Sequence, residues 1–125
     1  MKTIIIDENY KGIKKVNDSW FKHDGDLIIK DDVIIKINLI VNGEQLTKGF
    51  QYVNGSLHVN GKQYVGNVQI VIGSLHVKRS QSVVGEQCVA GDQYIGGSQY
   101  VGGYQEVYGK QEVKGKQYVD GKKIK

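Results

Sequence analysis

Proline is absent from this 125-residue chain, so no residue interrupts a β-ladder by lacking a backbone donor. Cys88 is the single cysteine, which excludes an internal disulfide framework and suits a reducing compartment. No apolar run approaches the roughly 20 residues of a membrane-spanning helix, and the N-terminus lacks the cleavage pattern of a signal peptide. We therefore expect a cytoplasmic protein that does not associate with membranes.

Glycine, by contrast, is abundant and regularly spaced, with 17 glycines in the chain. From Gly43 to Gly121 the sequence reads as hexads of the form Gly-x-Gln-x-Val-x, such as GKQYVG, GSQYVG and GKQEVK. Self-similarity at a hexapeptide period is typical of a β-helix. The glycines relieve the corners between short strands, where a Cβ would be in the way.

Glycine, glutamine and valine all occupy odd positions, which predicts one strict inside–outside alternation. The inward row therefore contains an aliphatic residue in each hexad from Gly49 to Asp120: Val53, Val59, Val65, Val71, Val77, Val83, Val89, Ile95, Val101, Val107, Val113 and Val119. The glutamines point inward too, and a buried amide is costly unless it is paired. We expect them to stack one coil apart in a hydrogen-bonded ladder, which is a structural role and not a binding one.

A longer period, of three hexads, shows how much of the chain completes one coil. Leucine replaces glutamine at Leu39, Leu57 and Leu75, each three hexads after the last. Three hexads per coil place these leucines on one side, called side A. Side B then carries the glutamine column that begins at Gln45, and side C the column that begins at Gln51. The sequence therefore predicts an all-β fold, a single-chain triangular β-solenoid (β-helix) with three hexapeptide sides, an 18-residue coil and a short N-terminal cap.

The first part of the chain does not follow the repeat. We expect an N-terminal strand and capping segment over residues 1–24 and the solenoid over 25–125, with about five coils from residue 37 onwards. Within the cap, Thr3 to Ile6 has the composition of a short strand, and Asp7 to Lys15 is polar and expected to be rich in loops.

Trp20 and Phe21 are the only adjacent pair of large aromatic residues before the repeat. An open solenoid end exposes its apolar interior, so terminal coils are usually covered. We expect Trp20 to lie over the first coil. The alternative is that Trp20 and Phe21 form a hot spot for a protein partner.

The outward rows differ between the sides. Side B alternates charged residues, serine and tyrosine, as an ordinary hydrated surface does. Side C instead carries mostly apolar and aromatic residues in adjacent rows: Phe50, Tyr52, Val68, Ile70, Cys88 and Tyr104, together with Glu86 and Glu106. A patch of this kind exceeds what scattered surface residues explain. Either the capping segment folds back over it, or it is a protein interface.

His58 and His76 share one outward column of side A, one coil apart, so their rings are expected roughly 5 Å from each other. Zinc needs at least three protein ligands, and the column continues with Tyr94 and Glu112. We therefore expect a repeated surface motif and no metal site. The glycine-rich hexads also lack a phosphate-loop lysine. The sequence predicts no catalytic residue, no cofactor and no small-molecule substrate.

The C-terminal coil is rich in lysine, which is the one feature that points to nucleic acid. The lysines are Lys110, Lys114, Lys116, Lys122, Lys123 and Lys125. Glu106, Glu112 and Asp120 interleave with them, so a solubilising end is the competing interpretation. Lys123 and Lys125 also fall at inward positions of the repeat, where a charge opposes edge-to-edge growth.

The Val-x-Gly spacing, as in Val59-Asn60-Gly61 and Val119-Asp120-Gly121, resembles bactofilins, the polymer-forming bacterial cytoskeletal proteins. The resemblance covers residues 25–125 and implies a β-solenoid that assembles head-to-head without nucleotide. Similar glycine-rich hexads occur in phage-encoded proteins, which implies a small protein that binds a host factor. Hexapeptide acyltransferases and their carbonic anhydrase relatives place a small residue where this chain has glutamine, two positions before valine.

Three functional hypotheses follow. The first is a non-enzymatic structural protein that self-associates, as a closed dimer through side C. The second is a binding module that presents a rigid side to a protein partner, such as a phage-encoded inhibitor of a host factor. The third is an enzyme of the acyltransferase or metal-dependent hydratase kind, which the departures from the acyltransferase pattern make the weakest.

Overall fold

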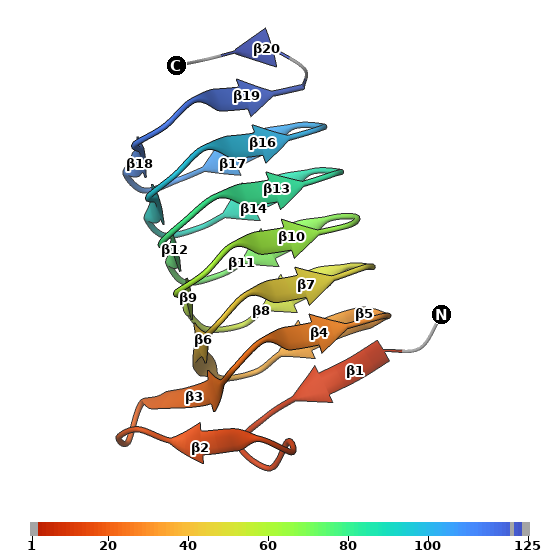
Figure 1. Cartoon of the computed structure of the whole chain (residues 1–125), viewed down its shortest axis with the longest axis vertical. Coiled ribbons are helices and arrows are strands. Elements are labelled where there is room, and N and C mark those ends of the chain that lie inside the picture. Colours follow the sequence, from red (N-terminus) through yellow and green to blue (C-terminus); the bar gives the residue numbers. More distant parts are fainter. Residues whose placement is uncertain (1–2, 121, 124–125) are drawn as a thin grey trace.

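A computed structural model describes residues 3–120 and 122–123. Its regular structure is entirely β, in three sheets whose strands succeed one another along the chain, and Figure 1 shows the coils stacked along the long axis. In the part of the chain that the structure describes, no helix is long and apolar enough to cross a membrane. The predicted all-β solenoid is confirmed.

Each side of the solenoid is one sheet. Side A consists of β2 (Ile13–Lys15), β3 (Trp20–Asp24), β6 (Asn38–Asn42), β9 (Leu57–Val59), β12 (Leu75–Val77), β15 (Gln93–Ile95) and β18 (Gln111–Val113). Side B consists of β4 (Leu27–Ile29), β7 (Gln45–Thr47), β10 (Gln63–Val65), β13 (Gln81–Val83), β16 (Gln99–Val101), β19 (Gln117–Val119) and β20 (Lys122–Lys123). Side C consists of β1 (Thr3–Ile6), β5 (Asp32–Ile35), β8 (Gln51–Val53), β11 (Gln69–Val71), β14 (Gln87–Val89) and β17 (Gln105–Val107).

The pairing register confirms the predicted 18-residue coil. Leu57 pairs with Leu75, Gln63 with Gln81 and Gln69 with Gln87, all in parallel strands. This spacing holds from β3 to β19, so the solenoid has about six turns. About five coils were expected from residue 37 onwards, and the structure adds one earlier coil, which consists of β3, β4 and β5.

The inward row is buried as predicted as far as Val101, but Gln105 is half-buried and Gln111 is exposed. Branched aliphatic residues fill the N-terminal coils, and the valines at the ends of the later strands are fully enclosed from Val53 to Val101. Val107 and Val119 are only half-buried, whereas Val113 between them is buried. The hydrophobic core is therefore best developed in the first coils and thins towards the C-terminus.

The inward glutamines form the expected ladder. On side B each side-chain Nε2 donates to the Oε1 one coil earlier: Gln63 to Gln45 at 2.7 Å, Gln81 to Gln63 at 2.7 Å, and Gln99 to Gln81 at 2.8 Å. Gln117 continues the column by donating to Gln99 at 2.7 Å. These bonds offset the cost of burying the amides, and they align the amide dipoles in one direction along the solenoid.

The ladder on side C has a break where the core changes from aliphatic to amide. Gln51 Oε1 accepts from Gln45 Nε2 at 2.6 Å and from Thr47 Oγ1 at 2.8 Å, so it is turned away from the next coil. Among the described residues, Gln69 Nε2 is left buried without a hydrogen-bond partner. Gln87 resumes the column by donating to Gln69 Oε1 at 2.8 Å.

Replacing one glutamine of the side B ladder should lower the stability of the protein by more than the loss of that glutamine's own contacts, because its neighbour is left with an unpaired amide group. In Gln81→Leu, Gln63 Oε1 loses its donor, and we expect a loss of about 1–3 kcal/mol in the free energy of unfolding. Replacing Gln63 and Gln81 together by leucine removes both partners of that bond, so the double variant should lose less than the sum of the single variants. Urea unfolding of the three variants measures the difference, and strict additivity would contradict the ladder.

A second ladder runs along the corner that precedes side A. Asn38 Oδ1 accepts the backbone N–H of Ser56 at 2.8 Å, and Ser56 Oγ accepts that of Ser74 at 3.0 Å. Further along, Asp92 Oδ1 accepts the backbone N–H of Lys110 at 2.9 Å. Short polar side chains thus satisfy corner amides that the strands leave unpaired.

Close approach of successive coils explains why a corner glycine is required. A Cβ at Gly61 would lie 2.7 Å from the carbonyl oxygen of Gly43. Gly61→Ala should therefore force the backbone apart and cost about 1–3 kcal/mol of stability, measured by urea unfolding. Gly103→Ala is the control, because its nearest neighbours, Glu86 Cγ and Gly85 O, lie at 3.2 Å. An equal loss in the two variants would contradict this explanation.

The N-terminal segment covers the first coil in a different way from the one expected. Ile4, Tyr10 and Ile13 pack against the aliphatic core. Trp20 lies instead in the wall of side A, opposite Asn38 of β6, and not over the open end. The 18-residue register thus begins at Trp20, whereas the repeat motif predicts its start at residue 25.

The structure confirms the predicted strand from Thr3 to Ile6, which joins side C as β1, but with Thr3 opposite Asp32. That pairing breaks the 18-residue register because β2 and its turns are inserted between β1 and β3. β2 runs antiparallel to β3, with Ile13 opposite His23, within a segment expected to be rich in loops.

At the other end β20 turns back and pairs antiparallel with β19, Tyr118 opposite Lys123. The turn passes through Asp120, whose φ of 55° is in the left-handed region. Parallel stacking on side B therefore stops at β19. The predicted inward position of the Lys123 side chain, and the whole of Lys125, lie outside the described residues.

Candidate functional site

The outward column of side C is apolar over five successive strands. Ile5 of β1 pairs with Ile34 of β5, which pairs with Tyr52 of β8, and the column continues through Ile70 of β11 to Cys88 of β14. Paired strands lie about 4.8 Å apart, so each side chain contacts the next. Strands β5, β8, β11 and β14 are each paired on both sides, whereas β1 is the edge strand of the sheet and pairs with β5 alone.

The rows on either side of this column add apolar residues, although Asp32 and Glu86 interrupt the preceding row, and Lys36 and Asn54 begin the following one. Phe50, Val68 and Tyr104 precede the strands, with Phe50 49% and Tyr104 74% exposed. Ile72 and Tyr108 follow the strands and are 46% and 70% exposed. We call the whole set the side C patch: Ile5, Ile34, Phe50, Tyr52, Val68, Ile70, Ile72, Cys88, Tyr104 and Tyr108.

Six of the eight interface residues predicted from sequence lie together in this patch: Phe50, Tyr52, Val68, Ile70, Cys88 and Tyr104. Trp20 and Phe21 do not, because β3 belongs to side A. Both are half-buried there, with Phe21 opposite the inward Leu39. Ile34 was missed although its position is in phase with the outward row. Ile5 could not have been found, because β1 departs from the 18-residue spacing.

Cys88 behaves as an apolar member of the patch. Burial, and then the nearby carboxylate of Glu106, raise the pKa of its thiol, which therefore remains protonated at neutral pH. Glu106 marks the C-terminal border of the patch, where it accepts a 2.8 Å hydrogen bond from the Tyr108 hydroxyl. That bond also raises the pKa of Tyr108.

The outward column at the strand centres of side B is more apolar than the hydrated surface predicted from the sequence. Its members, in strand order, are Ile28, Leu46, Tyr64, Ser82, Tyr100 and Tyr118. A shallow hollow lies over Leu46, Tyr64 and Ser82 and is bordered by Glu44 and Lys62. Charged residues flank the columns of both sides, but side C has more exposed apolar residues in the flanking rows, namely Phe50, Ile72, Tyr104 and Tyr108, than side B, which has Val84.

Side A places His58 and His76 in contact through their ring nitrogens. The two Nδ1 atoms lie 3.1 Å apart, and the rings meet edge to face with centroids at 4.2 Å. The ring of Tyr94 comes next and meets that of His76 edge to face, with the centroids 4.6 Å apart. Burial, followed by the charges of His58 and Lys78, lowers the pKa of His76, so the pair is poorly disposed to carry two protons.

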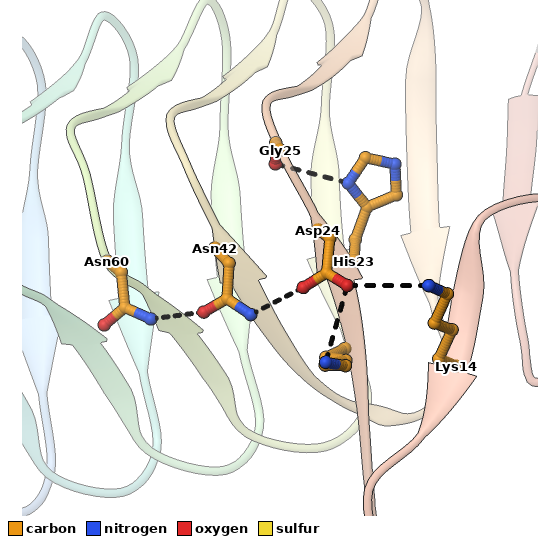
Figure 2. A network of polar contacts seen from close by, with 7 residues as sticks. Lys14, His23, Asp24, Gly25, Asn42 and Asn60 are labelled. Carbon is orange, nitrogen blue, oxygen red and sulfur yellow. Dashed lines mark hydrogen bonds and ion pairs between the residues drawn. The ribbon is translucent and has the colours of Figure 1, made fainter.

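A chain of polar side chains leads away from this pair along the corner after side A. His58 Nε2 lies 3.0 Å from Asn60 Oδ1, Asn60 Nδ2 donates to Asn42 Oδ1 at 2.7 Å, and Asn42 Nδ2 donates to Asp24 Oδ1 at 3.0 Å. Figure 2 shows Asn60, Asn42 and Asp24 in line, with Lys14 reaching the carboxylate. This chain spans three coils, and sequence reasoning did not foresee it.

The chain ends on an ionised carboxylate. The hydrogen bond from Asn42 lowers the pKa of Asp24, with Lys22 and Lys14 adding to the effect. The lysine Nζ atoms lie 3.4 Å and 3.7 Å from Asp24 Oδ2. Asp24 can therefore only accept hydrogen bonds, which sets the direction of every donor along the chain.

The three C-terminal lysines whose side chains are described do not lie on one side of the solenoid. Lys110 and Lys114 flank β18 on side A, and Lys116 precedes β19 on side B. Lys114 Nζ is bound by Glu112 at 2.7 Å, and that contact raises the pKa of Lys114. Of the other three lysines no side chain is described.

Within residues 3–120 and 122–123, no group of three or more histidine, cysteine, aspartate or glutamate side chains is placed to hold a metal ion. Comparison with models of known protein families, with curated proteins and with solved structures finds no match to this chain. The side C patch is the widest candidate surface, and the histidine pair is the chemically most distinctive one.

Proposed function

We propose that this chain is a non-enzymatic structural protein, a rigid β-solenoid that associates with a second copy of itself through the side C patch. The observation that carries the proposal is the patch itself, whose central column is apolar from β1 to β14 and is widened by Phe50, Val68 and Ile72. Exposed apolar surface on a flat, rigid sheet favours association because water is released without loss of backbone freedom.

A closed dimer is favoured over a filament because both ends are poor stacking surfaces. Tyr10 and Ile13 pack over the first coil, and β20 interrupts parallel stacking at the last. A flat side that meets its own copy around a two-fold axis closes after two subunits. Head-to-head growth of the bactofilin kind is the competing assembly.

The size of the side limits the affinity. One hexad by six strands spans roughly 20 Å by 29 Å, since a residue rises about 3.3 Å and strands lie about 4.8 Å apart. The resulting area of roughly 600 Å² is below the ~800 Å² that each partner buries in an interface of standard size. We therefore expect a dimer with a dissociation constant in the micromolar range.

Light scattering after size exclusion, at loadings from about 5 µM to about 500 µM, tests the proposal. The expected result is a shift from monomer to dimer that persists in about 1 M salt, because screening weakens charge contacts and not apolar ones. Filaments would overturn the closed dimer in favour of bactofilin-like growth. A monomer at all concentrations would overturn self-association and favour the second candidate, a phage-encoded type of module that binds a host protein through the same patch.

A further inference from the structure

We propose that His58 and His76 form a two-nitrogen chelating site for a divalent transition metal that favours imidazole. Of these metals, Cu²⁺ should bind most tightly. The site lies on side A, away from the side C patch, and is independent of the association proposed above. It rests on the 3.1 Å approach of the two Nδ1 atoms and on the polar chain that orients His58.

The polar chain determines which nitrogen of His58 carries the proton. Asp24 only accepts, so Asn42 donates to it, and Asn60 in turn donates to Asn42. The oxygen of Asn60 therefore faces His58, and only an N–H at Nε2 can pair with it at 3.0 Å. The neutral ring of His58 then has its lone pair on Nδ1, directed at His76.

This arrangement is the usual support of a metal-binding imidazole, in which the second ring nitrogen donates to an oxygen that fixes the tautomer. With His58 Nδ1 as the acceptor, the proton between the rings is assigned to His76 Nδ1. Moving that proton to His76 Nε2 keeps the ring neutral and leaves two lone pairs facing one another. His76 borders an open groove with Asp92, Tyr94 and Glu112, so solvent can exchange the proton.

The spacing suits a chelate. Metal–imidazole bonds are about 2.0–2.1 Å long, so two nitrogens 3.1 Å apart subtend an angle of about 100° at a shared metal. That value lies between the square-planar and tetrahedral angles. Each lone pair must turn by about 40° from the line between the two Nδ1 atoms to point at the shared metal, through rotation about the side-chain bonds.

Two protein ligands are too few for a structural zinc site, which the sequence does not predict. The proposed site is instead an open one, in which the protein supplies only two of the ligands. No third histidine, cysteine or carboxylate within the described part of the chain joins the pair, so solvent completes the coordination. Such an open site follows the general order of affinities, in which Cu²⁺ exceeds Ni²⁺ and Zn²⁺.

Calorimetric titration of Cu²⁺ into the full chain without an affinity tag tests the proposal. Every protein carries Cys88→Ser, which removes the thiol as a competing ligand. We expect one tight equivalent, and an electron paramagnetic resonance spectrum with coupling to two nitrogens. His58→Gln and His76→Gln should each abolish that equivalent, whereas the control His23→Gln, at the remaining histidine, should retain it.

Asn60→Ala tests the orienting role without removing a ligand. We expect the affinity for Cu²⁺ to fall about 10–100-fold, the usual effect of removing such a support. Thermal unfolding in the absence of metal checks that each variant is folded. An affinity unchanged by His76→Gln, or a spectrum with one nitrogen, would overturn the chelate. An affinity unchanged by Asn60→Ala would overturn the orienting role of the polar chain.

Discussion

Lysine in place of Val83 is expected to abolish the fold. Val83 is fully buried with Val65 and Val101 in the narrow interior of side B. An unpaired charge there costs several kcal/mol, a large part of the roughly 5–15 kcal/mol that holds a domain together. Val65→Lys should act in the same way. Circular dichroism should show either no cooperative transition or a melting temperature lower by more than about 15 °C, at roughly 4 °C per kcal/mol.

Val84→Lys is the matched control for this prediction. Val84 is the next residue along the chain, points to the opposite face and is 47% exposed. Its replacement should change stability by no more than about 0.5 kcal/mol. If Val83→Lys and Val84→Lys unfold at the same temperature, the inside–outside alternation is wrong.

The second large effect is expected on association. Val68 and Ile70 lie near the middle of the side C patch and point outward from the corner before β11 and from its centre. Changing both to lysine places charges in the dimer interface, where they lose water without gaining partners. Dimerisation should weaken at least about 100-fold, which corresponds to about 2.8 kcal/mol. Light scattering measures this loss, and thermal unfolding should show the coil intact.

Ser80 and Ser82 provide the control, because they hold the same two positions of a later hexad, on side B. Ser80→Lys with Ser82→Lys adds the same charge to a neighbouring side and should leave dimerisation unchanged. Equal weakening by the two double variants would mean that net charge, and not the side C patch, governs association.

The coil was predictable because its physics is periodic. One alternation and one recurrence of leucine at every third hexad are enough to assign inward rows and three sides, and the pairing of Leu57 with Leu75 confirms them. The hydrogen-bonded ladder also follows from the sequence, since a buried glutamine has few other ways to be satisfied. The break in the ladder at Gln69 could not be predicted from the sequence, because the break depends on the direction in which the side-chain amide of Gln51 points.

What escaped prediction lies where the period fails or where orientation matters. Ile5 enters side C only because an inserted hairpin changes the spacing after β1. Trp20 has an aromatic side chain suited to a cap, yet its backbone pairs in the wall of side A. The contact of His58 with His76 was expected from their column, but its support from Asn60 requires the direction of each hydrogen bond to be known.

The register between coils has a consequence for how such a chain can change in length. Loss or duplication of three consecutive hexads within the repeat removes or adds one complete coil, and every later residue stays on the same side of the solenoid. Loss of a single hexad leaves each strand intact but moves every later column around the corner to the next side. The apolar column of side C would then be broken although each hexad remained perfect. Changes in length that keep the side C column intact must therefore add or remove whole coils. The constraint comes from the pattern of surface residues, since a chain that lost one hexad could still form each strand.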